Sequence, residues 1–404
     1  MRWVASIQIV LYHMGQWTGW DSQGPAFWGS VWTQLFFLLS GFVLAYAELS
    51  KPPRTGSARP STLRYVRRRL VVLYPAFLAS LLLAVAISQG RTSVEWAMLP
   101  LHVLLMQAWL PLCRAAENGG LVCSPWTFNG EAWFISVLVV FWWFLRPLAE
   151  LFRKRSLRFS VLALVGCWLF TVLVVESGRA LAAAAALGSA GSFWAAVINI
   201  AIRATPVGYA HVFVAGVAAA RVFILLATRD AETGGSPAEG TQRLALAPER
   251  APLMLRFGCC AGYLAYAALL FARAGLGRCF LHLHNGGLLP VMLLVMLGAA
   301  IGVDPVATWI FRSRPLLTLG RISLMQYLMQ HVLQRWIENN FGWRDNAIAQ
   351  AVYLPSLLVF SYGCQRWVER PYAEYQRFRQ EKGIKGFEDR AIEWVEHRAL
   401  RAMP

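Results

Sequence analysis

The sequence predicts an all-α polytopic membrane protein with about ten transmembrane helices plus one or two re-entrant or interfacial segments. Three observations predict this fold class: 57% of the 404 residues are hydrophobic, only 15% are charged, and long apolar segments alternate with basic ones. A soluble domain is typically about 45–50% apolar and about 25% charged. The composition therefore excludes a water-soluble globular chain and a disordered one.

The apolar segments define the expected spans, because a helix needs about 20 apolar residues to cross the hydrocarbon core. Ten segments approach this length. They are residues 3–20, 26–47, 70–88, 126–146, 159–175, 204–226, 257–272, 282–303, 315–335 and 346–365. No internal repeat is visible, so an inverted-repeat transporter fold has no support.

The distribution of basic residues sets the expected orientation. With ten spans and a cytosolic N-terminus, the loops on the cytosolic side contain 25 Lys and Arg residues and the loops on the far side contain six. Such an excess marks the cytosolic face. We therefore expect an integral multi-pass membrane protein with both termini in the cytosol. The membrane would be a plasma membrane, an inner membrane or an endomembrane.

Two further apolar stretches, 96–112 and 180–202, fit neither a clear span nor a clear loop. If only one of them crossed the membrane, the basic loops after it would move to the far side. We expect both to be re-entrant or to lie on the outer face. The expected domains are a membrane domain at 1–370, a flexible cytosolic loop at 229–252, and a cytosolic amphipathic tail at 371–404.

The net charge of +17 does not indicate a nucleic-acid partner. The basic residues cluster between apolar segments, as expected for contact with an anionic leaflet of the lipid bilayer. The seven cysteines are too few for a disulfide scaffold. Cys113 and Cys123 flank a short loop on the far side, where an oxidising compartment would allow a disulfide.

Ionisable side chains inside spans are costly and often functional. His13 lies in the first span, about 16 Å along a helix from Arg2 at its cytosolic end. Glu131 lies at the start of a span between Trp126 and Phe134 and needs a partner. A Glu131–His13 pair would raise the basicity of the imidazole and fix its tautomer, as a general base requires. A structural ion pair, a solvated Glu131 and a His13 that is simply bonded to a neighbouring helix remain open.

Residues 51–69 carry seven basic side chains and no acidic one, and they end in Arg67, Arg68 and Arg69. In the simpler interpretation, these basic residues only fix the orientation of the chain in the membrane. The functional interpretation is a cytosolic site for a polyanionic cofactor, because arginine forks suit phosphate. No metal site is predicted, because His282 and His284 lack two further ligands at suitable spacing. A position at the membrane interface or in the lining of an acceptor site is favoured for them.

These residues resemble the acyltransferase-3 family of integral membrane O-acyltransferases across most of the chain. The motifs that carry the resemblance are, in order, Arg2 with His13, Phe36 to Phe42, Arg67–Arg69 with Tyr74–Pro75, Trp126 to Phe134 around Glu131, Gly320 with Ser323, Tyr327 and Leu328, and Val368 to Tyr372. Each motif alone is weak evidence for the resemblance, but six motifs in the order of the family are specific evidence for it.

The resemblance implies transfer of an acyl group, usually acetyl, from cytosolic acyl-CoA to a hydroxyl of an acceptor such as a glycan or glycolipid. It implies that Arg2, Arg67, Arg68 and Arg69 bind the CoA phosphates. His13 would be the general base or would carry the acyl group, and Glu131 would orient it. Ser323, Tyr327 and His331 would position the substrate, although Ser323 and Tyr327 equally suit helix packing.

Three departures from the family pattern are visible. Val72 stands where a second arginine is usual. The late histidine of the family falls on Gln330, and His331 follows one residue later, which rotates a helical side chain by about 100°. The chain also begins one residue before Arg2, as a truncated reading frame would. Two alternatives therefore stay open: a proton-coupled transporter or flippase that uses His13 and Glu131 as a relay, and a catalytically dead scaffold. The oligomeric state is not readable from the sequence.

Overall fold

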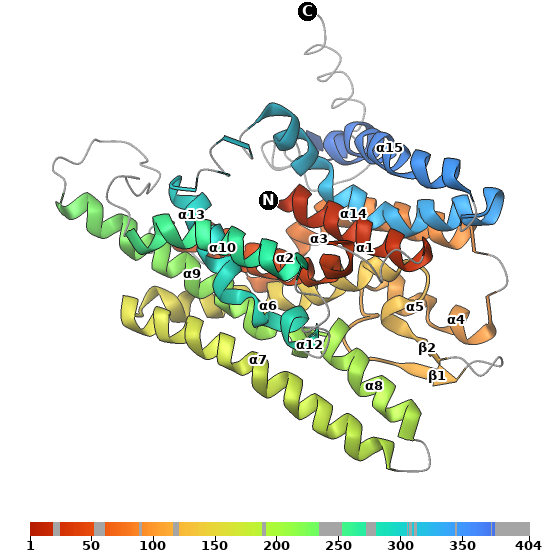
Figure 1. The fold of residues 1–404 in the computed structure, drawn as a ribbon, viewed down its shortest axis with the longest axis horizontal. Helices are drawn as coiled ribbons and strands as arrows, with labels where there is room; N and C mark the ends of the chain where they lie inside the picture. The colour runs from red at the N-terminus through yellow and green to blue at the C-terminus, as the bar shows by residue number, and fades with distance from the viewer. Residues whose placement is uncertain are drawn as a thin grey trace, which may run out of the picture.

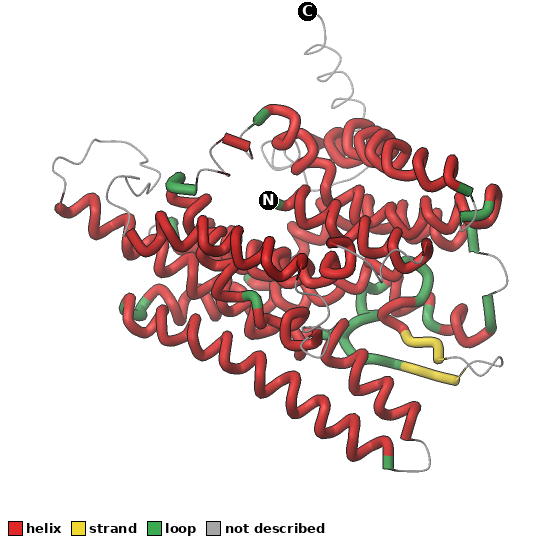
Figure 2. Tube along the Cα trace, viewed as in Figure 1, coloured by secondary structure: helices red, strands yellow, loops and turns green. Residues whose placement is uncertain are grey.

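The computed structural model describes residues 1–18, 25–51, 61–88, 91–115, 121–187, 191–233, 253–271, 280–304, 306, 309–310, 313–343, 346–372 and 374–375. In this part of the chain helices dominate, and the only strands form one short hairpin (Figures 1 and 2). The expected all-α class is confirmed for the described residues.

The elements follow one another along the chain with few long connections. They are α1 (Arg2–Thr18), η2 (Pro25–Trp32), α2 (Thr33–Leu49), α3 (Thr62–Ala86), α4 (Ser93–Ala97), α5 (Leu99–Val103), β1 (Cys113–Ala115), β2 (Leu121–Cys123), η3 (Ser124–Trp126), η4 (Gly130–Ala132), α6 (Trp133–Arg153), α7 (Leu157–Ala186), α8 (Gly191–Ala204), α9 (Pro206–Thr233), α10 (Leu253–Phe271), α12 (Phe280–His282), η7 (Leu283–Gly287), α13 (Leu289–Ile301), α14 (Arg314–Phe341), α15 (Ala347–Cys364) and η9 (Gln365–Glu369).

Several helices begin where the sequence offers a capping side chain. The hydroxyl of Ser61 accepts the backbone N–H of Arg64 at the start of α3, and Ser156 does the same at the start of α7. Thr92 and Glu95 form a reciprocal capping box at α4. Each cap satisfies backbone donors that the first helical turn leaves unpaired.

Within the described residues, six helical segments are long and apolar enough to cross a membrane. They are Trp28–Leu49, Thr62–Ala86, Gly130–Arg153, Leu157–Ala186, Gly191–Ala227 and Ala347–Tyr372. The expected membrane character is therefore confirmed, while the number ten stays a prediction. α1 is 17 residues long, and α13 is a shorter apolar helix of 13 residues.

The centre of the bundle is the crossing of α2 and α9, which is the most extensive helix pair. Gly41 on α2 lies directly against the backbone of Phe213 and Gly216 on α9. Gly216 in turn lies against the carbonyl of Leu38. A Cβ atom on either glycine would meet backbone, so these two positions let the helices approach closely, as small residues do in membrane bundles.

A second group of helices packs α1 against α14 and α14 against α15. The Ser6 hydroxyl donates to the carbonyl of Ser323 (3.3 Å), and the Gln334 amide donates to the carbonyl of His13 (3.5 Å). Both bonds join α1 to α14 and set the two helices side by side. This pairing brings His13 close to the middle of α14.

The ambiguous stretch at 96–112 forms no membrane-length helix. It contains the end of the short helix α4 and all of α5, and it leads into the β1–β2 hairpin, which the Cys113–Cys123 disulfide closes. Figure 1 shows α4, α5 and the hairpin gathered at one end of the bundle, which we call the hairpin end.

The other ambiguous stretch, 180–202, differs from expectation in detail. α7 continues without a break to Ala186, well beyond the predicted span end at residue 175, and α8 then packs back against it. A 30-residue helix is about 45 Å long, which exceeds the hydrocarbon thickness of about 30 Å. Part of α7 therefore extends past the core or the helix is tilted. The Ala-rich sequence after residue 175 hid this continuation, because its hydropathy is modest while its helix propensity is high.

Most of the predicted loop at 229–252 and nearly all of the predicted tail at 371–404 lie outside the described residues. α9 runs to Thr233, inside the predicted loop boundary. The division into a membrane domain, a loop and a tail stays a prediction.

Candidate functional site

The predicted pair of His13 and Glu131 lies together inside the bundle. The Nε2 atom of His13 is 2.8 Å from Oε1 of Glu131. His331 joins them, with its Nε2 atom 3.0 Å from the same carboxylate oxygen. The two imidazole rings lie 4.7 Å apart, centroid to centroid, at an interplanar angle of 68°. Residues from α1, η4 and α14 thus form one cluster, which we call the histidine cluster.

A network of polar contacts holds Glu131 in place. The segment before it is bent at Phe128, which has a positive φ of 55°. The buried Asn129 amide donates to the Ser80 hydroxyl (3.1 Å) and to the carbonyl of Leu328 (2.9 Å). The Gln107 amide donates to the carbonyl of Ala132 (3.1 Å). Asn129 therefore fixes the carboxylate between α3 and α14, and a buried hydrogen-bonded amide of this kind restricts movement.

Aromatic rings pack against the buried side of the histidine cluster. Phe36 and Phe134 contact the ring of Tyr327 at centroid distances of 5.9 and 5.7 Å. Tyr327 is buried, and its hydroxyl interacts with Glu131. The rings exclude water from one side of the carboxylate, which strengthens electrostatic contacts there.

On the other side, the cluster opens into a cavity of about 350 Å³ at the hairpin end, which we call the histidine cavity. Its polar lining comes from the cluster and from Ser30, Thr33, Arg203, His284 and Arg335. Its aromatic lining is Tyr12, Trp126 and Trp133. Hydroxyls, guanidinium groups and aromatic faces together suit a polar ring-shaped molecule better than an apolar one.

The position of Arg203 in this cavity depends on a break between α8 and α9. Pro206 has no N–H to donate to the carbonyl of Ile202, four residues earlier. The Asn285 amide replaces that donor and bonds the Ile202 carbonyl (2.8 Å) and the Gly208 carbonyl (3.2 Å). The Tyr209 hydroxyl donates to the carbonyl of Arg203 (3.1 Å).

The segment that supplies Asn285 is itself irregular. η7 is a π-helical turn, and Gly286 within it has a φ of 132°, which favours glycine. His284 from the same turn lies 2.8 Å from the Tyr209 hydroxyl through Nδ1. Local π-helical turns are frequent at functional sites. The turn carries His284 into the lining of the cavity, and its expected role toward an acceptor stays a prediction.

A second cavity of about 430 Å³ lies at the opposite end of the bundle, where α3 begins and α6 ends. We call it the arginine pocket. Its basic lining is Lys51, Arg68, Arg69 and Arg146, and Glu48 is its only acidic lining residue among those described. Arg69 and Arg146 both lie over the ring of Tyr65, at 5.3 and 4.9 Å from its centroid. This is a preorganised positive site of the kind that suits phosphate groups.

The remaining residues that the sequence singled out as site residues do not all line the two polar cavities. Arg67 is exposed and does not line the arginine pocket, and Arg2 is exposed but within electrostatic reach of Arg69. Ser323 uses its hydroxyl within its own helix, donating to the carbonyl of Gly320 (2.9 Å). Val72 lines the arginine pocket where the family usually has an arginine.

Sequence reasoning missed several lining residues. Arg146 lies within a predicted span and Arg203 in an Ala-rich stretch, so each reads as an isolated positive charge. Arg335 could have been found, because it lies one helical turn after His331 on the same face. The sequence offered no feature that identifies Asn129 as a site residue, except that it lies in the motif around Glu131.

The histidine cluster also contains three side chains of metal-ligating type. Their ligand atoms all lie within 4.8 Å of one another, and they form the one such group in the described residues. Ligands of tetrahedral zinc with bonds of about 2.0–2.1 Å are separated by roughly 3.3 Å. The shorter nitrogen–oxygen separations of 2.8 and 3.0 Å suit direct contact between the side chains. The absence of a metal stays a prediction.

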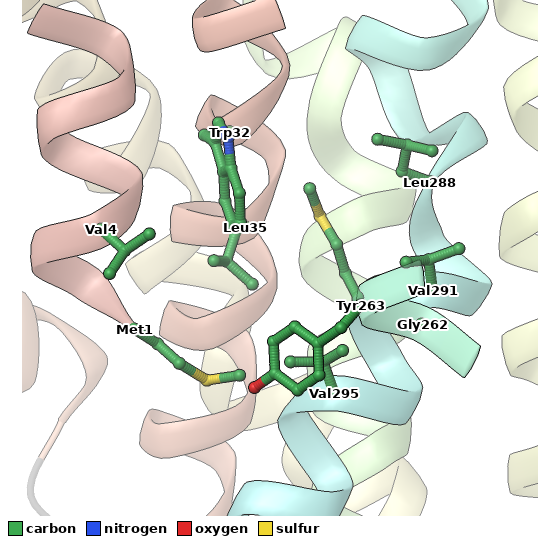
Figure 3. A pocket seen from close by; sticks show the side chains of 10 residues that line it. Met1, Val4, Trp32, Leu35, Gly262, Tyr263, Leu288, Val291 and Val295 are labelled. Atoms are coloured by element: carbon green, nitrogen blue, oxygen red, sulfur yellow. The ribbon is translucent and has the colours of Figure 1, made fainter. Parts of the chain in front are cut away.

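A third, apolar cavity of about 130 Å³ lies between the α1–α2 side and the α10–α13 side of the bundle. Figure 3 shows Met1, Val4 and Leu35 on one side of it and Leu288 and Val291 on the other. Its lining contains no charged side chain, which distinguishes it from the two polar cavities.

Comparison with known proteins supports a family assignment. The family model described as an acyltransferase domain matches residues 1–366. A curated relative, the acyltransferase MdmB of Streptomyces mycarofaciens, is 32% identical over 144 residues, which cover 32% of this chain and 35% of the relative. The chain is thus aligned to about a third of that relative's length. No solved structure shows a significant match. Because the family model covers most of the chain, with the family motifs in order, the chain belongs to the acyltransferase-3 family of integral membrane acyltransferases.

Proposed function

We propose that this protein transfers an acyl group, by default acetyl, from cytosolic acyl-CoA to a hydroxyl of a glycan, glycolipid or similar acceptor on the far side of the membrane. The observation that carries this proposal is the placement of the histidine cluster between two cavities of different chemistry. The arginine pocket suits the donor, and the histidine cavity suits the acceptor. Membership of the family and the similarity to a relative named as an acyltransferase support the reaction class.

Helix α14 shows how closely the two cavities approach. Leu324 lines the arginine pocket, while His331 and Arg335 line the histidine cavity. Seven residues separate Leu324 from His331, which is a rise of about 10 Å along the helix. The pantetheine arm of CoA is longer than this when extended. The histidine cluster is therefore within the length of an extended pantetheine arm whose phosphates stay in the arginine pocket, and the proposal requires that this arm pass the rings of Phe36, Phe134 and Tyr327.

The arginine pocket supplies what the nucleotide part of CoA requires. CoA carries a pyrophosphate and a 3′-phosphate, and Arg68, Arg69 and Arg146 present planar guanidinium groups to them. Arg146 compensates for Val72, since both line the same pocket. We assign this end of the bundle to the cytosol, as the positive-inside distribution predicts.

His13 is assigned the role of general base. Glu131 faces Nε2 of His13, and a carboxylate there favours the tautomer with the proton on Nε2. Nδ1 is then the basic nitrogen. The acceptor hydroxyl gives its proton to Nδ1 as its oxygen attacks the thioester carbonyl. The carbon–sulfur bond then breaks, and the CoA thiolate takes the proton back from the imidazolium.

A covalent route uses the same atoms. Nδ1 of His13 attacks the thioester carbonyl and releases the CoA thiolate, and the acceptor hydroxyl then takes the acyl group from the imidazole. The two routes differ in one observable. Only the covalent route releases CoA and leaves label on the protein before any acceptor is added.

His331 and Tyr327 are assigned to positioning. His331 contacts the same oxygen of Glu131 as His13 does, and this contact helps to hold the carboxylate in position. The Tyr327 hydroxyl faces Glu131 from the buried side. The Ser323 hydroxyl bonds within its own helix, which favours the packing role for that residue.

The test is an assay of the purified protein in nanodiscs with labelled acetyl-CoA and a panel of sugar acceptors, in which CoA release and labelled product are both followed. Loss of turnover in His13→Ala, with the fold retained, supports the proposal. Binding of acetyl-CoA that depends on Arg68 and Arg69 also supports it. Proton-coupled solute flux without any CoA binding would favour the transporter alternative, and neither activity would favour the scaffold.

A further inference from the structure

The apolar cavity between the α1–α2 side and the α10–α13 side of the bundle, which we call the apolar slot, has no part in the proposed reaction. Its volume is about 130 Å³, and its lining contains no charged side chain. Tyr263 lines the slot, but its hydroxyl already donates to Oδ2 of Asp304 (2.6 Å). A buried water needs roughly two to four polar partners, so this lining favours an apolar occupant.

One face of α13 forms the long wall of the slot. Leu288, Val291, Met292 and Val295 line it at the spacing i, i+3, i+4 and i+7, which places them on one side of a helix. The rise from Leu288 to Val295 is about 10 Å. Figure 3 shows Leu288 near one end of this wall and Val295 near the other. The slot is therefore elongated along the helices, a shape that suits a chain.

Three stretches of chain line first the apolar slot and then the histidine cavity. On α1, Val4 lines the slot, and Tyr12 lines the cavity about 12 Å farther along the helix. Where η2 meets α2, the adjacent residues Trp32 and Thr33 line the slot and the cavity respectively. In η7, His284 lines the cavity, and α13 then forms the wall of the slot. The slot and the histidine cavity are therefore neighbours along three separate elements.

The slot extends from the histidine cavity toward the opposite end of the bundle. Trp32 and Leu288 lie at one end of it, and Met1 and Tyr263 lie at the other (Figure 3). The second end is nearer the start of α1, which the distribution of basic residues assigns to the cytosol. A molecule with its head group in the cavity and its tail in the slot thus has the orientation of a lipid in the far leaflet.

The arginine pocket lies elsewhere. Its described lining residues come from α2, α3, α6 and α14 and from Lys51, and none comes from α1, α10 or α13. The apolar slot therefore adjoins the cavity that we assign to the acceptor, on elements that the donor pocket does not use.

We infer that the acyl acceptor carries an aliphatic chain, which lies in the apolar slot while its hydroxyl-bearing head group occupies the histidine cavity. The inference rests on the proposed function, since it assigns the histidine cavity to the acceptor. A methylene chain supplies the dispersion contacts that an unfilled apolar cavity lacks. It also holds the hydroxyl at one depth beside the histidine cluster, which favours reaction. The acceptor class narrows from glycans and glycolipids to lipid-linked hydroxyl compounds.

The first experiment locates the chain without any turnover. Wild-type protein in phosphatidylcholine nanodiscs is irradiated with an octyl glucoside whose chain ends in a diazirine, and the labelled peptides are identified by mass spectrometry. We expect label within residues 288–295 or 253–271, displaced by octyl glucoside and not by methyl glucoside. Label confined to exposed residues of α7 and α15 would overturn the inference. So would label in the slot that octyl glucoside fails to displace and that a diazirine-bearing phosphatidylcholine reproduces, because bulk lipid would then be the occupant.

The variants test whether the label depends on the slot. Val295→Phe fills the slot from α13, and Val4→Phe fills it from α1, so distortion of one helix does not decide the result. Val359→Phe is the matched control, because Val359 is 72% exposed on α15 and outside the slot. Each slot variant should reduce the label by about tenfold, and the control should not change it. Thermal unfolding reports that each variant is folded.

The second experiment uses turnover with acetyl-CoA as the donor. KM for octyl glucoside should be at least about tenfold below KM for methyl glucoside, and the slot variants should remove most of this difference. A difference that survives in both slot variants would show only partition of the chain into the bilayer and would overturn the inference. Slot variants that impair octanoyl-CoA as a donor and spare octyl glucoside would assign the slot to the donor chain and would also overturn it.

These outcomes are distinct from failure of the proposed function. Turnover of acetyl-CoA with equal KM for octyl and methyl glucoside would keep the function and refute the role of the slot. Label that the slot variants abolish, in a protein without any turnover of acetyl-CoA, would keep the chain-binding site and refute the function.

Discussion

His331 lies 3.0 Å from Glu131, through Nε2 and Oε1, although the family motif places its late histidine one residue earlier, on Gln330. A shift of one residue turns a side chain by about 100° around a helix, so the sequence left open whether His331 reaches the cluster. In the structure Gln330 is fully buried, its carbonyl accepts a hydrogen bond from the Tyr353 hydroxyl (3.0 Å), and His331 lines the cavity. The histidine at 331, not the glutamine at 330, therefore stands beside the carboxylate.

This placement predicts different effects for two neighbouring substitutions. His331→Ala should lower kcat by about 100-fold, because Glu131 loses one of the two imidazoles that hold it in position beside His13. Gln330→Met should lower it by no more than a few fold, since its side chain is not part of the cluster. Steady-state kinetics with acetyl-CoA check both. A Gln330→Met variant that is folded yet as inactive as His331→Ala would contradict the placement.

The arginine pocket predicts a defect specific to the donor. Replacing Arg68, Arg69 and Arg146 with Gln one at a time should each raise KM for acetyl-CoA by about tenfold, because each removes charge-assisted hydrogen bonds to phosphate. KM for the acceptor should not change. Arg64→Gln is the control, because Arg64 lies on the exposed first turn of α3 and does not line the pocket. A change in acceptor KM alone would contradict the assignment of the pocket to the donor.

The histidine cluster allows a direct test of metal dependence. The separations between its nitrogen and oxygen atoms suit contact between side chains, so we expect chelation to have no effect. Protein dialysed against EDTA should retain full turnover, and added Zn²⁺ should inhibit it by occupying His13. Activity that is lost on chelation and restored by Zn²⁺ would make the cluster a metal centre and remove the general-base role.

His102 predicts a pH dependence of stability outside the membrane-spanning helices. It is fully buried in α5 against the edge of Phe128, and burial lowers the pKa of its imidazole from 6.5 to about 4. Below pH 6.5 the unfolded chain binds a proton that the folded chain does not, so stability falls as the pH falls from 6.5 toward 4. The loss should reach a few kcal/mol at the lower end.

Thermal unfolding in detergent at several pH values measures this effect. His102→Phe should flatten the fall in Tm between pH 6.5 and 4, because the apolar ring has no proton to bind. An identical pH profile in the variant and the wild type would show that other groups control acid stability.

The sequence predicted which ionisable side chains meet at the centre of the bundle better than it predicted the lengths of the helices. The His13–Glu131 pair follows from the cost of isolated charges in a membrane, which demands a partner for each. The extent of α7 could not be read, because alanine contributes little hydropathy but strongly favours helix. Arg146 and Arg203 were missed because each is a single charge in an apolar stretch, and only the fold shows what faces it. The role of Asn285 depends on the missing N–H of Pro206, a contact across more than 70 residues.

The central claim is that His13 performs acyl transfer between a donor pocket and an acceptor cavity. The most direct measurement incubates purified protein in nanodiscs with radiolabelled acetyl-CoA, with and without a sugar acceptor, beside a His13→Ala variant that still binds acetyl-CoA. The account predicts CoA release and labelled acceptor with the wild type and at least about a 1,000-fold loss in the variant. Undiminished CoA release and acceptor labelling in His13→Ala would contradict it.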